Sequence, residues 1–177
     1  MDFQTINQME EGTNKNPVIF SKRHYDELKQ SRLTEELDLS VEDVIDNFEV
    51  FDIVRNIQDP EHPLTLEELN VITLEDIIVD EHKKVIAVGF TPTVPNCSSA
   101  ALIGLIILAK LQRSLPSNHH IQVFINKNCH DSEKQINKQM ADKERVAAAF
   151  ENANLVNTIN SKLKDSNETV NFGELFN

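Results

Sequence analysis

Several residue types are scarce in this 177-residue chain, and each scarcity argues against a class of protein. Two cysteines are too few for a disulfide framework or a four-thiolate zinc site. Four glycines, with no Gly-rich phosphate loop among them, argue against a nucleotide site of the usual kind. The chain has only 17 basic residues against 29 acidic ones, and the resulting net charge of -12 disfavours direct binding of nucleic acid.

Long apolar runs and sorting signals are also lacking. The most apolar stretch, 100–109, is about half the roughly 20 residues that a membrane-spanning helix needs, so we expect no membrane span. The chain does not open with a basic segment followed by an apolar one, which predicts a protein of the cytosol or nucleus. Aromatic residues make up only 6% of the chain, so the core of the single expected domain should be mostly aliphatic.

Polarity divides the chain into three parts. Residues 1–39 are polar and irregular and are expected to form a disordered N-terminal arm. Residues 40–163 carry the apolar patterns of a folded domain, and residues 164–177 form a polar C-terminal tail.

Within the domain, apolar spacing and turn residues predict helices and strands in a mixed order. The expected elements are a helix from an N-cap at Ser40 to about 58, a capped turn at 65–69, a hairpin of strands 77–79 and 85–90, a buried helix at 98–111, a strand at 121–125, a helix from a capping box at Ser132 and Gln135 to 150 with a break near 141–142, and a helix at 154–163. They predict an α/β domain of the two-layer α+β kind. A small mixed sheet of about three strands would be packed by a central buried helix and further helices.

Cys97 is the strongest candidate for a reactive thiol. It precedes the buried helix, where unpaired N–H groups and the helix dipole stabilise a thiolate. The alternative is a half-buried cysteine that packs as a small hydrophobe. Cys129 and His130 follow the third strand and would approach Cys97 if that strand lies beside the second. They are then candidate metal or cluster ligands, whereas spacing alone favours a solvated loop.

Two charged segments are further candidates. Asp59, Glu61 and His62 lie in the turn DPEHP and offer metal ligands or an acid-base group, although a rigid turn explains the same residues. The second segment has mixed charges at helical spacing, typical of a solvated face and also of a docking face: Asp142, Lys143, Glu144 and Arg145.

Seven phrases in this order resemble one family over residues 48–163. They are FDIVR at 51–55, DPEHP at 59–63, EELNV at 67–71, FTPTVP at 90–95, LIGL at 102–105, RSLP at 113–116, and NKQ at 137–139 followed by DKERVAAA at 142–149. The chain is similar to cytosolic iron-sulfur assembly component 2, a spindle-associated family related to bacterial PaaD and SufT proteins. The phrase NPVIF at 16–20 is similar to the B-type member.

The resemblance implies a non-enzymatic component of a late-acting complex that delivers iron-sulfur clusters to cytosolic and nuclear apo-proteins. The implied partners are a WD-repeat propeller, a HEAT-repeat adaptor and the apo-protein clients, with a further link to the spindle and to chromosome segregation. No stably bound cofactor is implied, only a transient iron-sulfur cluster or zinc. The oligomeric state stays open between a monomer and a homodimer formed by element swapping.

The resemblance also assigns site residues. It places Cys97 on the family's reactive cysteine and His130 on the histidine of its Gly-Thr-His loop, while the two charged segments become docking candidates. The chain departs from the family where Asn96 replaces a histidine and where Asn128 and Cys129 replace Gly-Thr. The rival hypothesis is a thiol-dependent enzyme with Cys97 as nucleophile and His130 or His62 as base.

Overall fold

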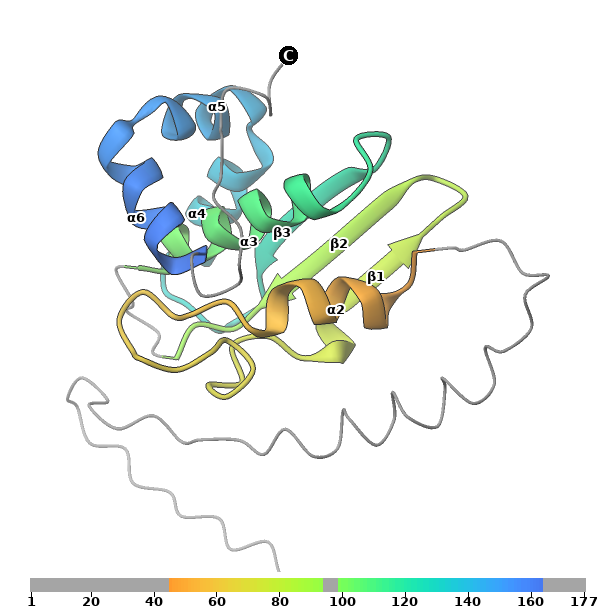
Figure 1. Ribbon diagram of the computed structural model, residues 1–177, viewed down its shortest axis with the longest axis horizontal. Coiled ribbons are helices and arrows are strands. Elements are labelled where there is room, and N and C mark those ends of the chain that lie inside the picture. Colours follow the sequence, from red (N-terminus) through yellow and green to blue (C-terminus); the bar gives the residue numbers. More distant parts are fainter. Residues whose placement is uncertain (1–44, 94–98, 164–177) are drawn as a thin grey trace, which may run out of the picture.

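A computed structural model describes residues 45–93 and 99–163, which fold into a sheet with helices packed on one face (Figure 1). The elements in order are α2 (Asn47–Arg55), the short 3₁₀ helix η1 (Leu74–Asp76), β1 (Ile77–Asp80), β2 (Val85–Phe90), α3 (Ala100–Ser114), β3 (His120–Ile125), α4 (Glu133–Ala141), α5 (Lys143–Glu151) and α6 (Ala153–Leu163). None of these helices is long and apolar enough to cross a bilayer. The predicted α+β class is confirmed.

The sheet has the order β1-β2-β3 and is mixed, as predicted. β1 and β2 form the expected antiparallel hairpin, in which Ile77 pairs with Val88. β3 runs parallel to β2, with Phe90 beside Ile125, because α3 carries the chain back to the starting end of the sheet. The third strand therefore lies beside the second, which was the condition for an approach of Cys129 and His130 to Cys97.

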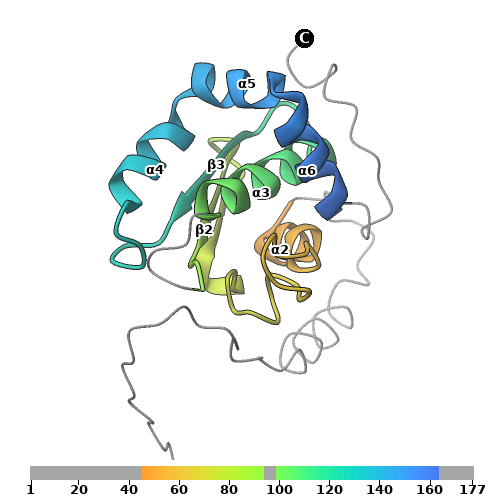
Figure 2. The same cartoon turned by 90° about the vertical axis from the view of Figure 1, so that its left-hand side faces the viewer.

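Helix α3 is the centre of the domain. Ten of its fifteen residues are buried, since its sequence is apolar on almost every side. It packs on β3, on α2 and on the two helices α4 and α6, which Figure 2 shows on either side of it. The opposite face of the sheet carries more exposed side chains, including Ile78 at 63% exposure, so the domain has two layers.

Helix α2 is shorter than predicted. Asp46 is its N-cap and accepts a hydrogen bond from the Glu49 N–H at 2.9 Å, whereas the expected cap, Ser40, lies outside the described residues. The helix ends at Arg55 rather than near Gln58, because Gln58 pairs with Thr65 in an isolated antiparallel bridge. The backbone therefore leaves the helix one turn early.

The predicted turn at 65–69 is confirmed and is tied to α2. Glu68 accepts hydrogen bonds from both the N–H and the hydroxyl of Thr65 at 2.9 Å, the expected capping-box contact. Glu67 pairs with Arg55 through two bonds, Nε to Oε2 at 2.7 Å and Nη2 to Oε1 at 2.9 Å. This ion pair is nearly buried, with side-chain exposures of 8% for Arg55 and 11% for Glu67.

The C-terminal helices confirm the predicted break and correct one cap. Asp142 separates α4 from α5 and caps α5 by accepting bonds from the N–H groups of Glu144 and Arg145. The predicted capping box at Ser132 is wrong, because its hydroxyl makes no cap bond. Its own N–H instead donates to Nδ1 of His130 at 3.0 Å.

Candidate functional site

The candidate site lies at the carboxyl ends of β2 and β3. These ends are adjacent because the two strands are parallel and in register, and such edges are where open α/β sheets commonly bind ligands. Thr91 continues from β2 and Asn126 from β3. Cys97 belongs to residues 94–98, which lie outside the described residues, but both flanks of that segment, Thr93 and Ser99, are described.

A hydrogen-bond network joins the two strand ends on the exposed face of the sheet. The Asn126 side-chain amide donates to Oδ1 of Asp76 at 2.7 Å and to the Thr91 hydroxyl at 3.1 Å. It lies directly over Gly89, where an added Cβ would come within 2.3 Å of the Asn126 amide oxygen. The network therefore depends on the missing side chain at Gly89.

Cys129 is connected to this network. The Thr91 hydroxyl donates to Sγ of Cys129 at 3.8 Å, and the thiol in turn donates to the Lys127 carbonyl at 3.4 Å. Because the Thr91 oxygen already accepts from Asn126, its own proton is directed at the sulfur. Cys129 is half-buried against the core, so it is held beside the end of β2 rather than in a freely solvated loop.

His130 is adjacent to Cys129 and is oriented by the backbone. Its Nδ1 accepts from the Ser132 N–H, which places the proton of the neutral ring on Nε2. Cys129 therefore brings a thiol to this end of the sheet, and His130 adds an imidazole that can ligate a metal only once its Nδ1 releases the Ser132 N–H or its Nε2 loses its proton. Within the described ranges, no group of three His, Cys, Asp or Glu side chains is arranged to hold a metal.

The turn at 59–63 reaches the same region from another direction. Asp59 is only 2% exposed and accepts from the N–H groups of Glu61 and His62 at 2.8 Å, as a turn-forming aspartate does. Glu61 is exposed and accepts a hydrogen bond from the hydroxyl of Ser99, at the start of α3. The turn is thus attached to the helix that follows residues 94–98, and Asp59 itself offers almost no surface to a partner.

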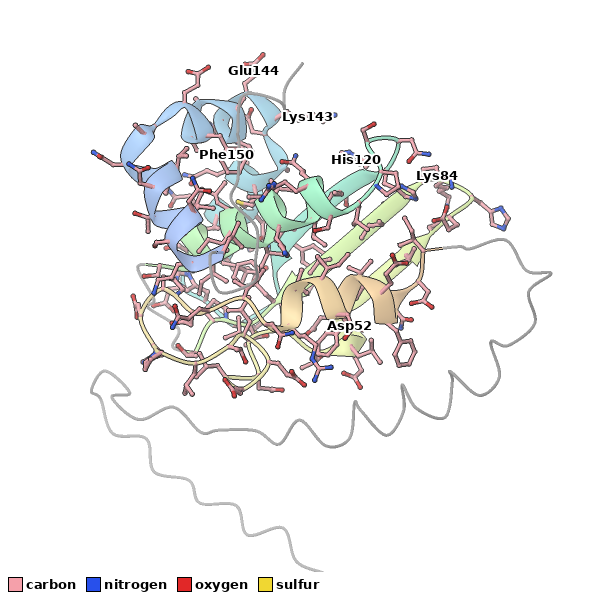
Figure 3. All side chains as sticks on the ribbon, viewed as in Figure 1. Asp52, Lys84, His120, Lys143, Glu144 and Phe150 are labelled. Atoms are coloured by element: carbon pink, nitrogen blue, oxygen red, sulfur yellow. The ribbon has the colours of Figure 1, made fainter. Side chains whose placement is uncertain are left out.

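The second charged segment lies on α5. Asp142 is occupied as the helix cap and also pairs with Arg145 at 3.4 Å, while Lys143, Glu144 and Arg145 are exposed. Figure 3 shows Lys143 and Glu144 on this outer helix. The segment is therefore a solvated face of mixed charge, separate from the Cys129 site.

Sequence reasoning did not single out Asp76, Gly89, Thr91 or Asn126 as site residues. Their contacts join residues 35 to 50 positions apart, and no local pattern encodes such pairs. The one available signal was Gly89, because an isolated glycine inside a strand often marks the close approach of another group.

Known proteins resemble the chain over most of its length. Residues 48–123 match the family described as iron-sulfur cluster assembly protein. Mouse cytosolic iron-sulfur assembly component 2B is 49% identical over 150 residues, covering 85% of this chain and 90% of the mouse protein. The Drosophila melanogaster MIP18 family protein galla-2 is 51% identical over 137 residues, covering 77% and 88% of the two chains. A Caenorhabditis elegans MIP18 family protein is 47% identical over 155 residues, covering 85% and 94%. As its sequence phrases predicted, the chain belongs to the MIP18 family, that of cytosolic iron-sulfur assembly component 2B.

Proposed function

We propose that this protein is a non-enzymatic component of the cytosolic machinery that transfers iron-sulfur clusters to apo-proteins. The observation that carries the proposal is the 45–51% identity to four relatives over 77–85% of the chain, a span that includes the strand ends and the Cys129 loop. The mouse and Dictyostelium discoideum relatives are named cytosolic iron-sulfur assembly component 2B, and these names support a role in iron-sulfur assembly in the cytosol. We also propose that part of the protein is nuclear and spindle-associated, where it would serve nuclear apo-proteins.

The chemistry around Cys129 fits brief handling of a cluster as cargo. Cys129 and His130 present a thiol and an imidazole at one end of the sheet, and both ligand types bind iron in clusters. Cys97 would supply a further thiol from the segment between Thr93 and Ser99. An incomplete ligand set suits a carrier, because a cargo that is to be released must not be held by four strong ligands.

The described groups favour a carrier over a thiol-dependent enzyme. A nucleophile needs a base whose other nitrogen is oriented by a third group. His130 accepts the Ser132 N–H on Nδ1, a backbone contact that holds the loop, and Asp59 uses its carboxylate on its own turn. With its Nδ1 lone pair used by the Ser132 N–H and the proton of the neutral ring on Nε2, His130 is not placed to take a proton from a thiol, and neither group is positioned as the base of such an enzyme.

Two groups of polar residues, exposed except for the half-buried His62, are the proposed docking surfaces for the larger assembly proteins. Glu61 and His62 lie on a rigid turn, and Lys143, Glu144 and Arg145 lie on α5. We propose that a WD-repeat propeller and a HEAT-repeat adaptor bind these two surfaces and bring the apo-protein clients to the site. Charged rims of this kind set association rate and specificity more than raw affinity.

Co-elution with the two scaffold proteins tests this proposal. The full chain is expected to form a complex with each scaffold at micromolar concentration on size-exclusion chromatography. The variant Lys143→Glu/Arg145→Glu should weaken one of the two complexes, because it reverses exposed charges on α5. Lys134→Glu/Lys138→Glu on the exposed side of α4 is the matched control and should co-elute like the unaltered chain. A chain that bound neither scaffold would contradict the proposed role.

A further inference from the structure

Strand β3 is an outer strand whose backbone is half unpaired. Pairing with β2 uses every second residue, as the His120 N–H to Lys84 O bond at 2.7 Å and the Asn126 N–H to Phe90 O bond at 2.9 Å show. The alternation of a parallel ladder therefore directs the N–H and C=O groups of Ile121, Val123 and Ile125 toward the open edge. Among the described residues, those of Ile121 and Val123 have no hydrogen-bond partner.

Asn137 shows what kind of group this edge accepts. The Ile125 N–H donates to Oδ1 of Asn137 at 2.7 Å, and Nδ2 of Asn137 donates back to the Ile125 carbonyl at 3.0 Å. A side-chain amide has the same donor and acceptor as a peptide group. Asn137 therefore occupies the place of one peptide of a fourth strand, and leaves the two positions before it open.

A groove of about 780 Å³ runs beside those two positions, lined by parts of α3, β3, α4 and α5. Leu108, Met140 and Val146 give it an apolar lining on the helical side. Its charged lining residues are one lysine and one glutamate, Lys143 and Glu144, so the groove is close to neutral in a chain of net charge -12. Figure 3 shows both on α5, with His120 marking the beginning of β3.

We propose that this groove binds an extended peptide segment of another protein as a fourth strand on β3. Backbone groups of the peptide would pair with the N–H and C=O groups of Ile121 and Val123, which are four groups on two residues. Every second peptide side chain would face the apolar helical side, so the segment alternates apolar and polar residues. It carries low net charge, because the near-neutral groove offers an acidic or basic segment no compensating charge and the acidic chain repels acidic segments. The inference does not depend on the proposed assembly role.

Peptide selection on the full chain tests the proposal. A display library of random heptapeptides is expected to yield low-charge sequences with apolar residues at every second position and no internal proline. Binding should slow hydrogen exchange of the Ile121 and Val123 N–H groups about tenfold or more, while those of Gln122 and Phe124, already paired with β2, change little.

Two variants separate edge pairing from a general loss of structure. Ile121→Pro removes an N–H that faces the edge and spares every bond to β2, so a selected peptide should bind about tenfold or more weakly. Ile78→Lys alters an exposed side chain on β1, at the other edge of the sheet and outside the groove, and should bind within about twofold. Circular dichroism should show both variants folded.

Three results would overturn the inference. Enriched peptides with helical spacing would assign the groove to a helix. Unchanged affinity of folded Ile121→Pro would exclude backbone pairing. Protection of the same two amides by self-association, without peptide, would make a second copy of the chain the occupant.

Discussion

Replacement of Arg55 by Met is expected to lower the free energy of unfolding by about 3–5 kcal/mol, because it leaves the Glu67 carboxylate nearly buried without its partner. Arg55 holds both oxygens of Glu67, at 2.7 and 2.9 Å, and its guanidinium lies 5.5 Å above the Phe51 ring. The pair joins α2 to the turn at 65–69, so its loss weakens the packing of α2 against that turn. Urea unfolding followed by circular dichroism measures the change.

The double variant Arg55→Met/Glu67→Met is the control for this effect. It removes the stranded charge as well as the ion pair, so we expect it to recover more than half of the lost stability. Lys83→Met breaks an exposed pair with Asp80 and should change stability by less than about 1 kcal/mol. A single Arg55→Met variant as stable as Lys83→Met would mean that the Arg55–Glu67 contact contributes little.

Gly89→Ala is expected to destabilise the protein by about 2–3 kcal/mol, although alanine in an unstrained strand position would ordinarily stabilise by about 0.4–1 kcal/mol. The added Cβ would lie 2.3 Å from the Asn126 amide oxygen and 3.3 Å from the Phe124 ring. Asn126 must therefore move, and its bonds to Asp76 and Thr91 are lost with it. The steric effect outweighs the gain in chain entropy.

A double-mutant cycle isolates this clash. If Asn126 is the group that must move, Gly89→Ala/Asn126→Ala should be about as stable as Asn126→Ala alone, so the two costs do not add. The thermal midpoints of the four proteins give the comparison. Additive losses would place the cost elsewhere in the sheet.

Local sequence patterns predicted the elements that depend on near neighbours. The hairpin follows from β-branched runs on both sides of 80–84, and α3 from an apolar segment bounded by Pro95 and Pro116. The break was expected near 141–142, and the structure adds the reason, the capping side chain of Asp142. The N-terminal caps were predicted less well: α2 begins after Asp46 rather than Ser40, and the Ser132 side chain makes no cap bond. Several residues near a helix start can serve as its cap, and tertiary contacts decide among them.

Long-range contacts could not be predicted in this way. Glu61 meets Ser99 across 38 positions, and Asn126 meets Asp76 across 50, with nothing in either local sequence to indicate its partner. For the candidate site, placing the two strands side by side predicted that Cys129 and His130 approach Cys97, which lies outside the described residues. The Thr91 bond places Cys129 beside the end of β2, whereas its approach to Cys97 and the role of Cys97 stay predictions.

The phrases that identify the family are largely structural in this fold. Arg55 and Glu67 come from two of them and form the nearly buried ion pair, and Asp59 from a third closes its turn. The family could therefore be identified from residues that stabilise the fold of the domain. Among the residues proposed to handle cargo, Cys97 and His130 match the family pattern, whereas Cys129 lies where the chain departs from it.

The most direct test of the central claim is the maturation of iron-sulfur enzymes in cells depleted of their own MIP18 family member. Expression of this chain is expected to restore the activity and the iron content of a cytosolic iron-sulfur enzyme. The Cys97→Ala variant, folded and equally abundant, should restore little of either, while the same substitution at an exposed α4 residue, Lys138→Ala, should restore both. Failure of the unaltered chain to restore the enzyme would contradict a role in cluster delivery, and full restoration by Cys97→Ala would remove the thiol from it.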